Sequence, residues 1–229
     1  MTDEQKQAVI DRDFQKMLDL GGNVSGISLS PDGRHLYAAN LDLHRLDVVD
    51  TGTLRVVAQT EVGKGPVRPV PTRNGRYVLV SNFRDSTVTI VDGRSYQAVR
   101  TVGVGNGPIP AVVGPSGRWA WVANSGDGTA TQIDLTRLAK TGHRVLRTVP
   151  VGQVPWMLRL NASGSTLFVA NKESNFVSVV CTKDGSDPGA LAASGPASWL
   201  IGGPWLYTGG SSSTVSAYAA SALGAERCP

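Results

Sequence analysis

The sequence has few of the residues that would reveal a catalytic or metal-binding site. Its 229 residues include only 3 His and 2 Cys, and 17% of them are charged. The histidines, His35, His44 and His143, show no HxH or HxxxH spacing, and no CxxC, CxxCH, EF-hand or GxSxG motif occurs. Metal centres, attached haem and hydrolase nucleophile elbows depend on such clusters. The sequence therefore predicts no metal ion, no cofactor and no catalytic residue.

Long hydrophobic runs and densely charged segments are also absent. No apolar stretch reaches about 18 residues, so no transmembrane helix is expected. The N-terminal segment MTDEQKQAVIDRDF is polar and acidic, and it does not resemble a signal peptide. Either the protein is cytoplasmic, or a secretory signal lies outside this sequence. The formal charge of +4 comes without a dense Lys/Arg run, so there is no specific nucleic-acid signal.

The two cysteines, Cys181 and Cys228, do not form a disulfide framework by number or spacing. They are compatible with two free buried thiols or with a single disulfide, and the sequence leaves both possibilities open.

An internal repeat is the main feature that the sequence does contain. Each copy has a turn with a glycine, an apolar stretch ending in asparagine, and a second apolar stretch: Ser30–Asp50, Thr72–Asp92, Gly114–Asp134 and Asn161–Cys181. The turn glycines Gly33, Gly75 and Gly117 are 42 residues apart. Gly164 follows after a further 47 residues. A period of this length, with several short strands in each unit, predicts an all-β propeller.

The second copy shows how one unit folds. Its four extended stretches are Val67–Thr72, Tyr77–Ser81, Thr87–Val91 and Ala98–Val104. Gly75 supplies the positive φ of the first turn, and four antiparallel strands make one propeller blade. The predicted units are 21–62, 63–104, 105–151, 152–194 and 195–229. The last unit is a degenerate copy in which Gly209 replaces the asparagine and the outer strand is nearly absent.

Residues 1–20 have two interpretations. As a helix, Thr2 and Gln5 form a capping box, and Ile10 and Phe14 share an apolar face. As extended chain, the segment from Phe14 onward adds an outer strand to the last blade and closes the ring. The sequence does not decide between them.

The repeated strand resembles that of a known family. It reads YAAN, LVSN, WVAN and FVAN, and a G-x-x-P segment opens the later copies at Gly63, Gly105 and Gly152. This pattern resembles the YVTN β-propeller repeat over roughly residues 21–223. The resemblance implies kinship with lactonase-like propellers, the haem-binding propeller of nitrite reductase and extracytoplasmic proteins, and it favours a periplasmic or secreted location. Such propellers usually have seven blades. This chain has room for about five, as a five-bladed ring or an incomplete larger one.

The repeat also acts as an internal control. A residue present in every copy serves the blade, whereas a residue present in one copy is available for a ligand. By this criterion two repeated sets are structural: the strand-end asparagines Asn40, Asn82, Asn124 and Asn171, and the aspartates Asp50, Asp92 and Asp134. Both sets are expected to bond the backbone of adjacent turns.

Copy-specific residues gather on the loops expected around the channel mouth. The predicted ligand-binding residues are Lys64, Arg68, His44, Arg84, Trp156 and Arg159. Arg68 and Arg159 occupy innermost strands at positions that are uncharged in other copies, and arginine suits carboxylate or phosphate groups.

The absence of a catalytic constellation favours a non-enzymatic scaffold that binds a protein partner or an anionic small molecule. One alternative is a lactonase-like hydrolase that uses His44 as a base, oriented by one of the acidic residues Asp42, Asp85 and Glu173. A second alternative is a cofactor-binding domain of a larger redox protein.

Overall fold

The computed structural model describes residues 18–136, 138, 144–187, 189–192, 199–201, 205–209, 216–219 and 228. Residues 1–17 fall outside these ranges, so neither the terminal helix nor the closing strand is tested. His143 also falls outside them.

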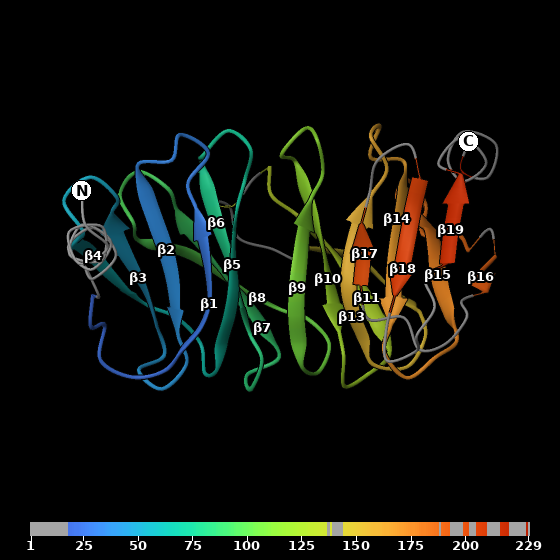
Figure 1. Ribbon diagram of the computed structural model, residues 1–229, viewed down its shortest axis with the longest axis horizontal. Helices are drawn as coiled ribbons and strands as arrows, with labels where there is room; N and C mark the ends of the chain where they lie inside the picture. The colour runs from blue at the N-terminus through green and yellow to red at the C-terminus, as the bar shows by residue number, and fades with distance from the viewer. Residues whose placement is uncertain are drawn as a thin grey trace, which may run out of the picture.

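All regular secondary structure in the described ranges is β, arranged as five antiparallel sheets (Figure 1). The first sheet contains β1 (Val24–Leu29), β2 (His35–Asn40), β3 (Arg45–Asp50) and β4 (Arg55–Glu61). The second contains β5 (Pro66–Pro71), β6 (Tyr77–Asn82), β7 (Thr87–Asp92) and β8 (Ala98–Gly103). The third contains β9 (Pro108–Val113), β10 (Trp119–Asn124), β11 (Thr129–Asp134) and β12 (Val145–Pro150). The fourth contains β13 (Pro155–Leu160), β14 (Thr166–Asn171), β15 (Phe176–Cys181) and β16 (Leu191–Ala192). The described part of the fifth contains β17 (Trp199–Ile201), β18 (Trp205–Gly209) and β19 (Ser216–Ala219).

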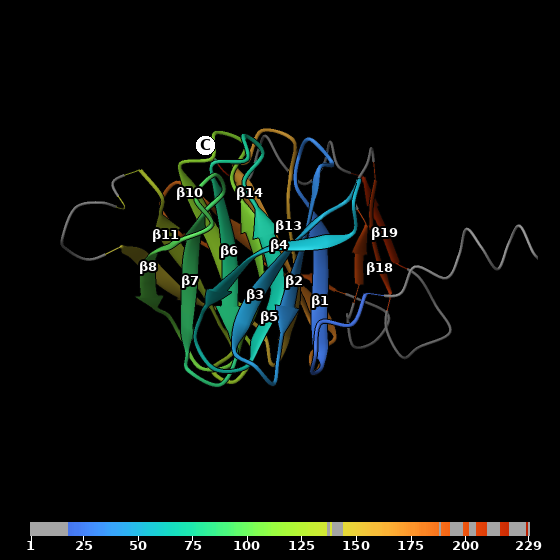
Figure 2. The ribbon, with the colours of Figure 1, turned by 90° about the vertical axis from the view of Figure 1, so that its left-hand side faces the viewer.

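The five sheets follow one another as blades. Strands within each sheet pair in chain order, and the inner strands β1, β5, β9, β13 and β17 are neighbours in that order. Figure 1 shows the first blade at one side of the molecule and the fifth at the other, and Figure 2 views the first blade from its own side. This arrangement confirms the predicted propeller architecture.

The turn between the first two strands of each of the first four blades depends on one glycine. Gly33, Gly75 and Gly117 have φ values of 71°, 68° and 68°. Only glycine adopts this left-handed region without a steric cost. In the second blade the Thr72 hydroxyl accepts the Tyr77 N–H at 3.0 Å, which fixes the start of β6. The repeated turn is therefore specified locally.

Apolar side chains of the two middle strands pack between successive blades. Between the first and second blades, Tyr37 and Val48 of one contact Val78 and Val80 of the other, and all four are buried. The next two interfaces repeat this pattern with Leu79 and Ile90, and then with Trp121 and Leu167 among their members. Burial on both faces explains why these strands are continuously apolar.

A side chain on the inner strand of the first blade is exposed, whereas the equivalent side chain of the fourth blade is buried. Ile27 pairs with Ala38 two residues before Asn40, and Leu158 pairs with Val169 two residues before Asn171. The two side chains thus hold equivalent positions. Leu158 packs on the third blade and is 4% exposed, whereas Ile27 is 62% exposed. Position in the array, and not residue type, determines this burial.

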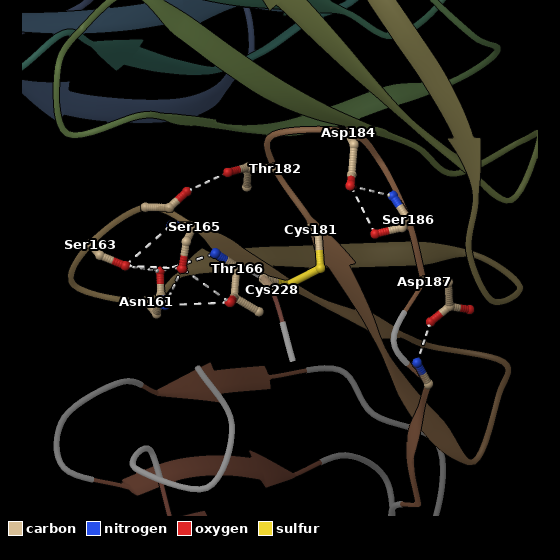
Figure 3. Close-up of a disulfide and its surroundings, with 12 residues drawn as sticks. Asn161, Ser163, Ser165, Thr166, Cys181, Thr182, Asp184, Ser186, Asp187 and Cys228 are labelled. Carbon is tan, nitrogen blue, oxygen red and sulfur yellow. Dashed lines mark hydrogen bonds between the residues drawn. A yellow bond between two sulfur atoms is a disulfide. The ribbon is translucent and has the colours of Figure 1, made fainter. Parts of the chain in front are cut away.

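The two cysteines form a disulfide, which decides between the two alternatives left open by the sequence. Cys181 ends β15, where the earlier blades have aspartate, and its Sγ is bonded to that of Cys228 (Figure 3). Both residues are buried, at 3% and 6% exposure. The bond joins the C-terminal end of the chain to the fourth blade.

Aspartates cap the turns after the third strands, as predicted. Asp50 accepts the Thr53 N–H at 2.7 Å, and Asp92 accepts the Ser95 N–H at 2.9 Å. The Thr53 hydroxyl and N–H hold the pKa of Asp50 below its usual value, and the Ser95 N–H does so for Asp92. In the fourth blade Asp184 takes this role from within the turn.

Candidate functional site

Two sets of loops meet on one face of the propeller. The leading loops run into each first strand, and the central loops join the second and third strands. In the second blade, Phe83 N–H of the central loop bonds Gly65 O of the leading loop at 2.9 Å. Ser125 to Gly107 and Lys172 to Val154 repeat this bond at 3.0 and 2.9 Å. We call the surface formed by these loops the loop face.

The repeated asparagines are fully buried beneath the loop face. The Asn82 amide donates to Thr87 Oγ1 at 3.0 Å and to Thr89 Oγ1 at 2.9 Å. These partners are hydroxyls of the third strand, not the turn backbone that the sequence suggested, although Asn40 does accept the Leu43 N–H at 3.1 Å. The asparagines nevertheless act inside each blade, as the internal control predicted.

Glycine at the start of each leading loop follows from the same packing. A Cβ on Gly63 would lie 2.7 Å from Cγ of Asn82. Gly105 approaches Asn124 in the same way, where a Cβ would lie 2.6 Å from the amide nitrogen. No side chain fits at such distances, so the first residue of the G-x-x-P segment must be glycine.

Replacing Asn82 by alanine should lower the free energy of unfolding by about 1 kcal/mol or more, because the buried Thr89 hydroxyl and the part-buried Thr87 hydroxyl lose their donor. Urea denaturation of the variant and the parent measures the change. Ligand binding by the folded fraction should be unaffected. Loss of binding at an unchanged melting temperature would contradict the structural role of the repeated asparagines.

Three acidic residues of the loop face bond backbone N–H groups. Asp42 accepts from Asn23 at 3.1 Å, Asp85 from Lys64 at 2.6 Å, and Asp127 from Asn106 at 2.5 Å. In the fourth blade Ser174 Oγ accepts from Gln153 at 2.9 Å. Each bond ties a central loop to its leading loop. These carboxylates repeat from blade to blade with small shifts in sequence position, so they serve the blade.

His44 is engaged with the backbone. Its Nδ1 lies 3.0 Å from Leu41 O and 3.5 Å from Gly65 N. The shorter contact requires a proton on Nδ1, because a carbonyl oxygen only accepts. Since Asp42 and Asp85 bond backbone N–H groups, this geometry gives no support to a base formed by His44 and a rim carboxylate.

Arg68 lies at the centre of the arc of inner strands. Its Nη1 reaches Met157 Sδ on β13, at 3.9 Å, from its own position on β5. On the other side, a Cβ at Gly26 of β1 would lie 3.0 Å from the Arg68 backbone nitrogen. Arg68 is exposed and has a φ of 40°. It therefore reaches the space shared by three blades.

Arg159 and Trp156 both lie on β13. Arg159 is exposed and pairs with Phe168 across the strand, the position that Ser28 and Val112 hold in other blades. Trp156 is half-buried, and Lys172 Nζ lies 4.8 Å from its ring centroid, a cation–π distance. The structure brings Trp156 and Lys172 together, but it shows no direct contact between Arg68 and Arg159.

Lys64 and Arg84 are adjacent and exposed on the second blade. Arg84 N–H bonds Lys64 O at 3.1 Å, and a Cβ at Gly65 would lie 2.9 Å from Arg84 Cγ. Among the described residues, no carboxylate lies within ion-pair distance of either side chain. Sequence reasoning missed their exposed apolar neighbours Leu43 and Phe83, although an apolar residue in one copy of a polar loop is a detectable signal.

The described residues hold neither a metal site nor a membrane-spanning helix. They contain no group of three or more His, Cys, Asp or Glu placed to hold a metal ion. The same part of the chain contains no helix of the length and hydrophobicity needed to cross a membrane.

Comparison with solved structures identifies the fold class as a β-propeller. Hydrazine synthase from Kuenenia stuttgartiensis matches with a TM-score of 0.71 and 23% identity over 85% of this chain. The β-propeller domain of Cps50 (Swd1) from Myceliophteria thermophila matches with a TM-score of 0.74 and 16% identity over 89%. A functionally unknown protein from Desulfotomaculum acetoxidans matches with a TM-score of 0.76 and 13% identity over 88%.

The chain spans 57% of the length of the hydrazine synthase chain and 67% of each of the other two. No protein-family model and no curated protein matches the sequence. The chain is therefore a β-propeller scaffold, and at these identities the similarity establishes the fold alone.

Proposed function

We propose that the protein is a non-enzymatic binding scaffold that holds an anionic ligand or an acidic partner on its loop face and channel mouth. The observation that carries this proposal is a set of cations on that face without a carboxylate partner. Carboxylates of Asp42, Asp85 and Asp127 are exposed as well, but each bonds a backbone N–H group. Lys64, Arg68 and Arg84 are exposed, and among the described residues no carboxylate lies within ion-pair distance of them, so their donors are open to an anion.

Arginine chemistry supports an anionic ligand. A guanidinium presents a planar fork of donors that matches carboxylate and phosphate oxygens. Arg68 contributes such a fork at the centre, where blades one, two and four converge, and Arg159 contributes another from β13. A site shared by several blades on a rigid scaffold is pre-organised, which reduces the entropic cost of binding.

Titration with phosphate and with succinate tests the proposal. The parent should bind one of them with an affinity that falls as salt is added, because exposed charges are screened. The double variant Arg68→Ala/Arg159→Ala should lose about tenfold or more in affinity. Arg118→Ala, in a turn at the opposite end of the third blade, removes charge elsewhere and should bind like the parent. Equal affinities in all three proteins would refute the role of the central arginines.

The proposal extends to the repeat type and the compartment. A YVTN-type repeat is supported by the fit of Gly63 and Gly105 against the repeated asparagines. An extracytoplasmic location is supported by the disulfide between Cys181 and Cys228, because disulfides persist in oxidising compartments and are rare in the cytosol. Alkylation of free thiols in protein isolated from its native host would test the compartment.

A further inference from the structure

Two large apolar side chains are exposed on the loop face above the first two blades. Leu43 is 46% exposed and Phe83 is 41% exposed. Leu43 lies over the first leading loop, where a Cβ at Gly22 would be 3.4 Å from its Cγ. Phe83 extends toward the third blade, and a Cβ at Gly107 would be 3.2 Å from its Cε2. Both side chains rest on glycines, which leaves their outer surfaces open to a partner.

The central turn does not need these side chains. Phe83 and Arg84 make the backbone bonds that Ser125 and Gly126 make in the third blade, to Gly107 O and Asn106 O at 3.0 Å each. Lys172 and Glu173 make them again in the fourth blade. Four different residue types, one of them glycine, thus occupy the same turn positions in the other two blades. The internal control places Phe83 and Arg84 among residues available for a ligand.

Charged groups of both signs lie next to the apolar pair in the same loops, and the carboxylates of Asp42 and Asp85 are bonded to backbone N–H groups. Lys64 and Arg84 lie on either side of Gly65, and the ring of His44, adjacent to Leu43, approaches the Gly65 N–H at 3.5 Å. Gly65 therefore connects the central loop of the first blade with that of the second. We call this continuous surface, Leu43, His44, Lys64, Phe83 and Arg84, the basic–apolar ridge.

We infer that the basic–apolar ridge binds an acidic protein segment that inserts one or two apolar side chains. The inference rests on the proposed function, and it specifies the partner and where it binds. Lys64 and Arg84 have no carboxylate within ion-pair distance among the described residues, so acidic groups of the segment can pair with them. Leu43 and Phe83 supply the apolar contact that a small anion would leave unused. A peptide fits better than a nucleic acid, because Phe83 is the single aromatic ring of the ridge, Leu43 offers no stacking surface, and the sequence has no dense basic run.

Fluorescence anisotropy with short labelled peptides tests the inference. The probe peptide is rich in Asp and Glu and carries one Leu and one Phe, and a second peptide has both replaced by Ser. The variant Phe83→Ser/Arg84→Gly installs the residues of the third blade, so its turn should form normally. We expect it to bind the anchored peptide about tenfold more weakly than the parent. Arg118→Gly, which removes one charge at the opposite end, should bind like the parent.

The outcomes separate this inference from the proposed function. Tighter binding of the anchored peptide, lost in Phe83→Ser/Arg84→Gly, supports both. Equal binding of the two peptides, or full binding by that variant, overturns the ridge while leaving anion binding in place. If the parent binds phosphate or succinate but neither peptide, the inference about the ridge is wrong and the proposed anion binding stands. Tighter binding of a labelled oligothymidylate than of the anchored peptide overturns the protein-segment assignment. Absence of all binding refutes both proposals.

Discussion

Replacing Cys228 by serine should lower the free energy of unfolding by about 2–4 kcal/mol. The bond to Cys181 closes a loop with a sequence separation of 47 residues, and cross-linking a loop of this length removes much entropy from the unfolded chain. Both cysteines are buried, so the variant also buries a serine hydroxyl. Urea denaturation of the variant and the oxidised parent measures the difference.

Reduction provides the matched control. Parent protein treated with a thiol-free reductant should unfold close to the midpoint of the Cys228→Ser variant, and the reductant should not change the variant itself. Equal unfolding midpoints for oxidised parent, reduced parent and variant would show that the disulfide does not hold the C-terminal end on the fourth blade.

The second large effect is a difference in the free energy of unfolding between alanine variants at two equivalent positions. Leu158→Ala should cost about 2–5 kcal/mol, because the side chain is 4% exposed and its removal leaves a cavity between the third and fourth blades. Ile27→Ala should cost less than about 1 kcal/mol, because Ile27 is 62% exposed at the corresponding site. Chemical denaturation of the two variants provides the comparison.

A large loss of stability in Ile27→Ala would contradict this description of the first blade. It would mean that its outward face is covered in solution. Size-exclusion chromatography with light scattering over a range of concentrations would then show whether a second copy provides the cover.

The fold was predictable from the sequence because the same pattern of turn and strands occurs in four copies. Glycine at the first turn, asparagine at the end of the second strand and the alternating third strand each have local physical causes. The register of Tyr77 with Asp92, and of Trp119 with Asp134, follows from those short turns. The predicted second-blade strands differ from the observed ones by one residue at most ends.

The candidate site was only partly predictable, because it depends on contacts between loops of different blades. Sequence position alone did not show that Asp42, Asp85 and Asp127 bond backbone N–H groups. It also did not show that Leu43 and Phe83 remain exposed, since apolar residues in this protein are usually buried. The disulfide was undecidable for the same reason, because the separation of two cysteines along the chain does not give their distance in space.

The central loops can accept new residues on the loop face without a change of backbone shape. Their shape is fixed by backbone bonds to the leading loops, as with Phe83 to Gly65 and Ser125 to Gly107. Substitutions at the two turn positions that make these bonds in the second, third and fourth blades are therefore largely uncoupled from folding. Exchanging these residue pairs among blades would generate a combinatorial library of surfaces on one backbone. Selection for a new specificity on this chain could then proceed with little loss of stability along the way.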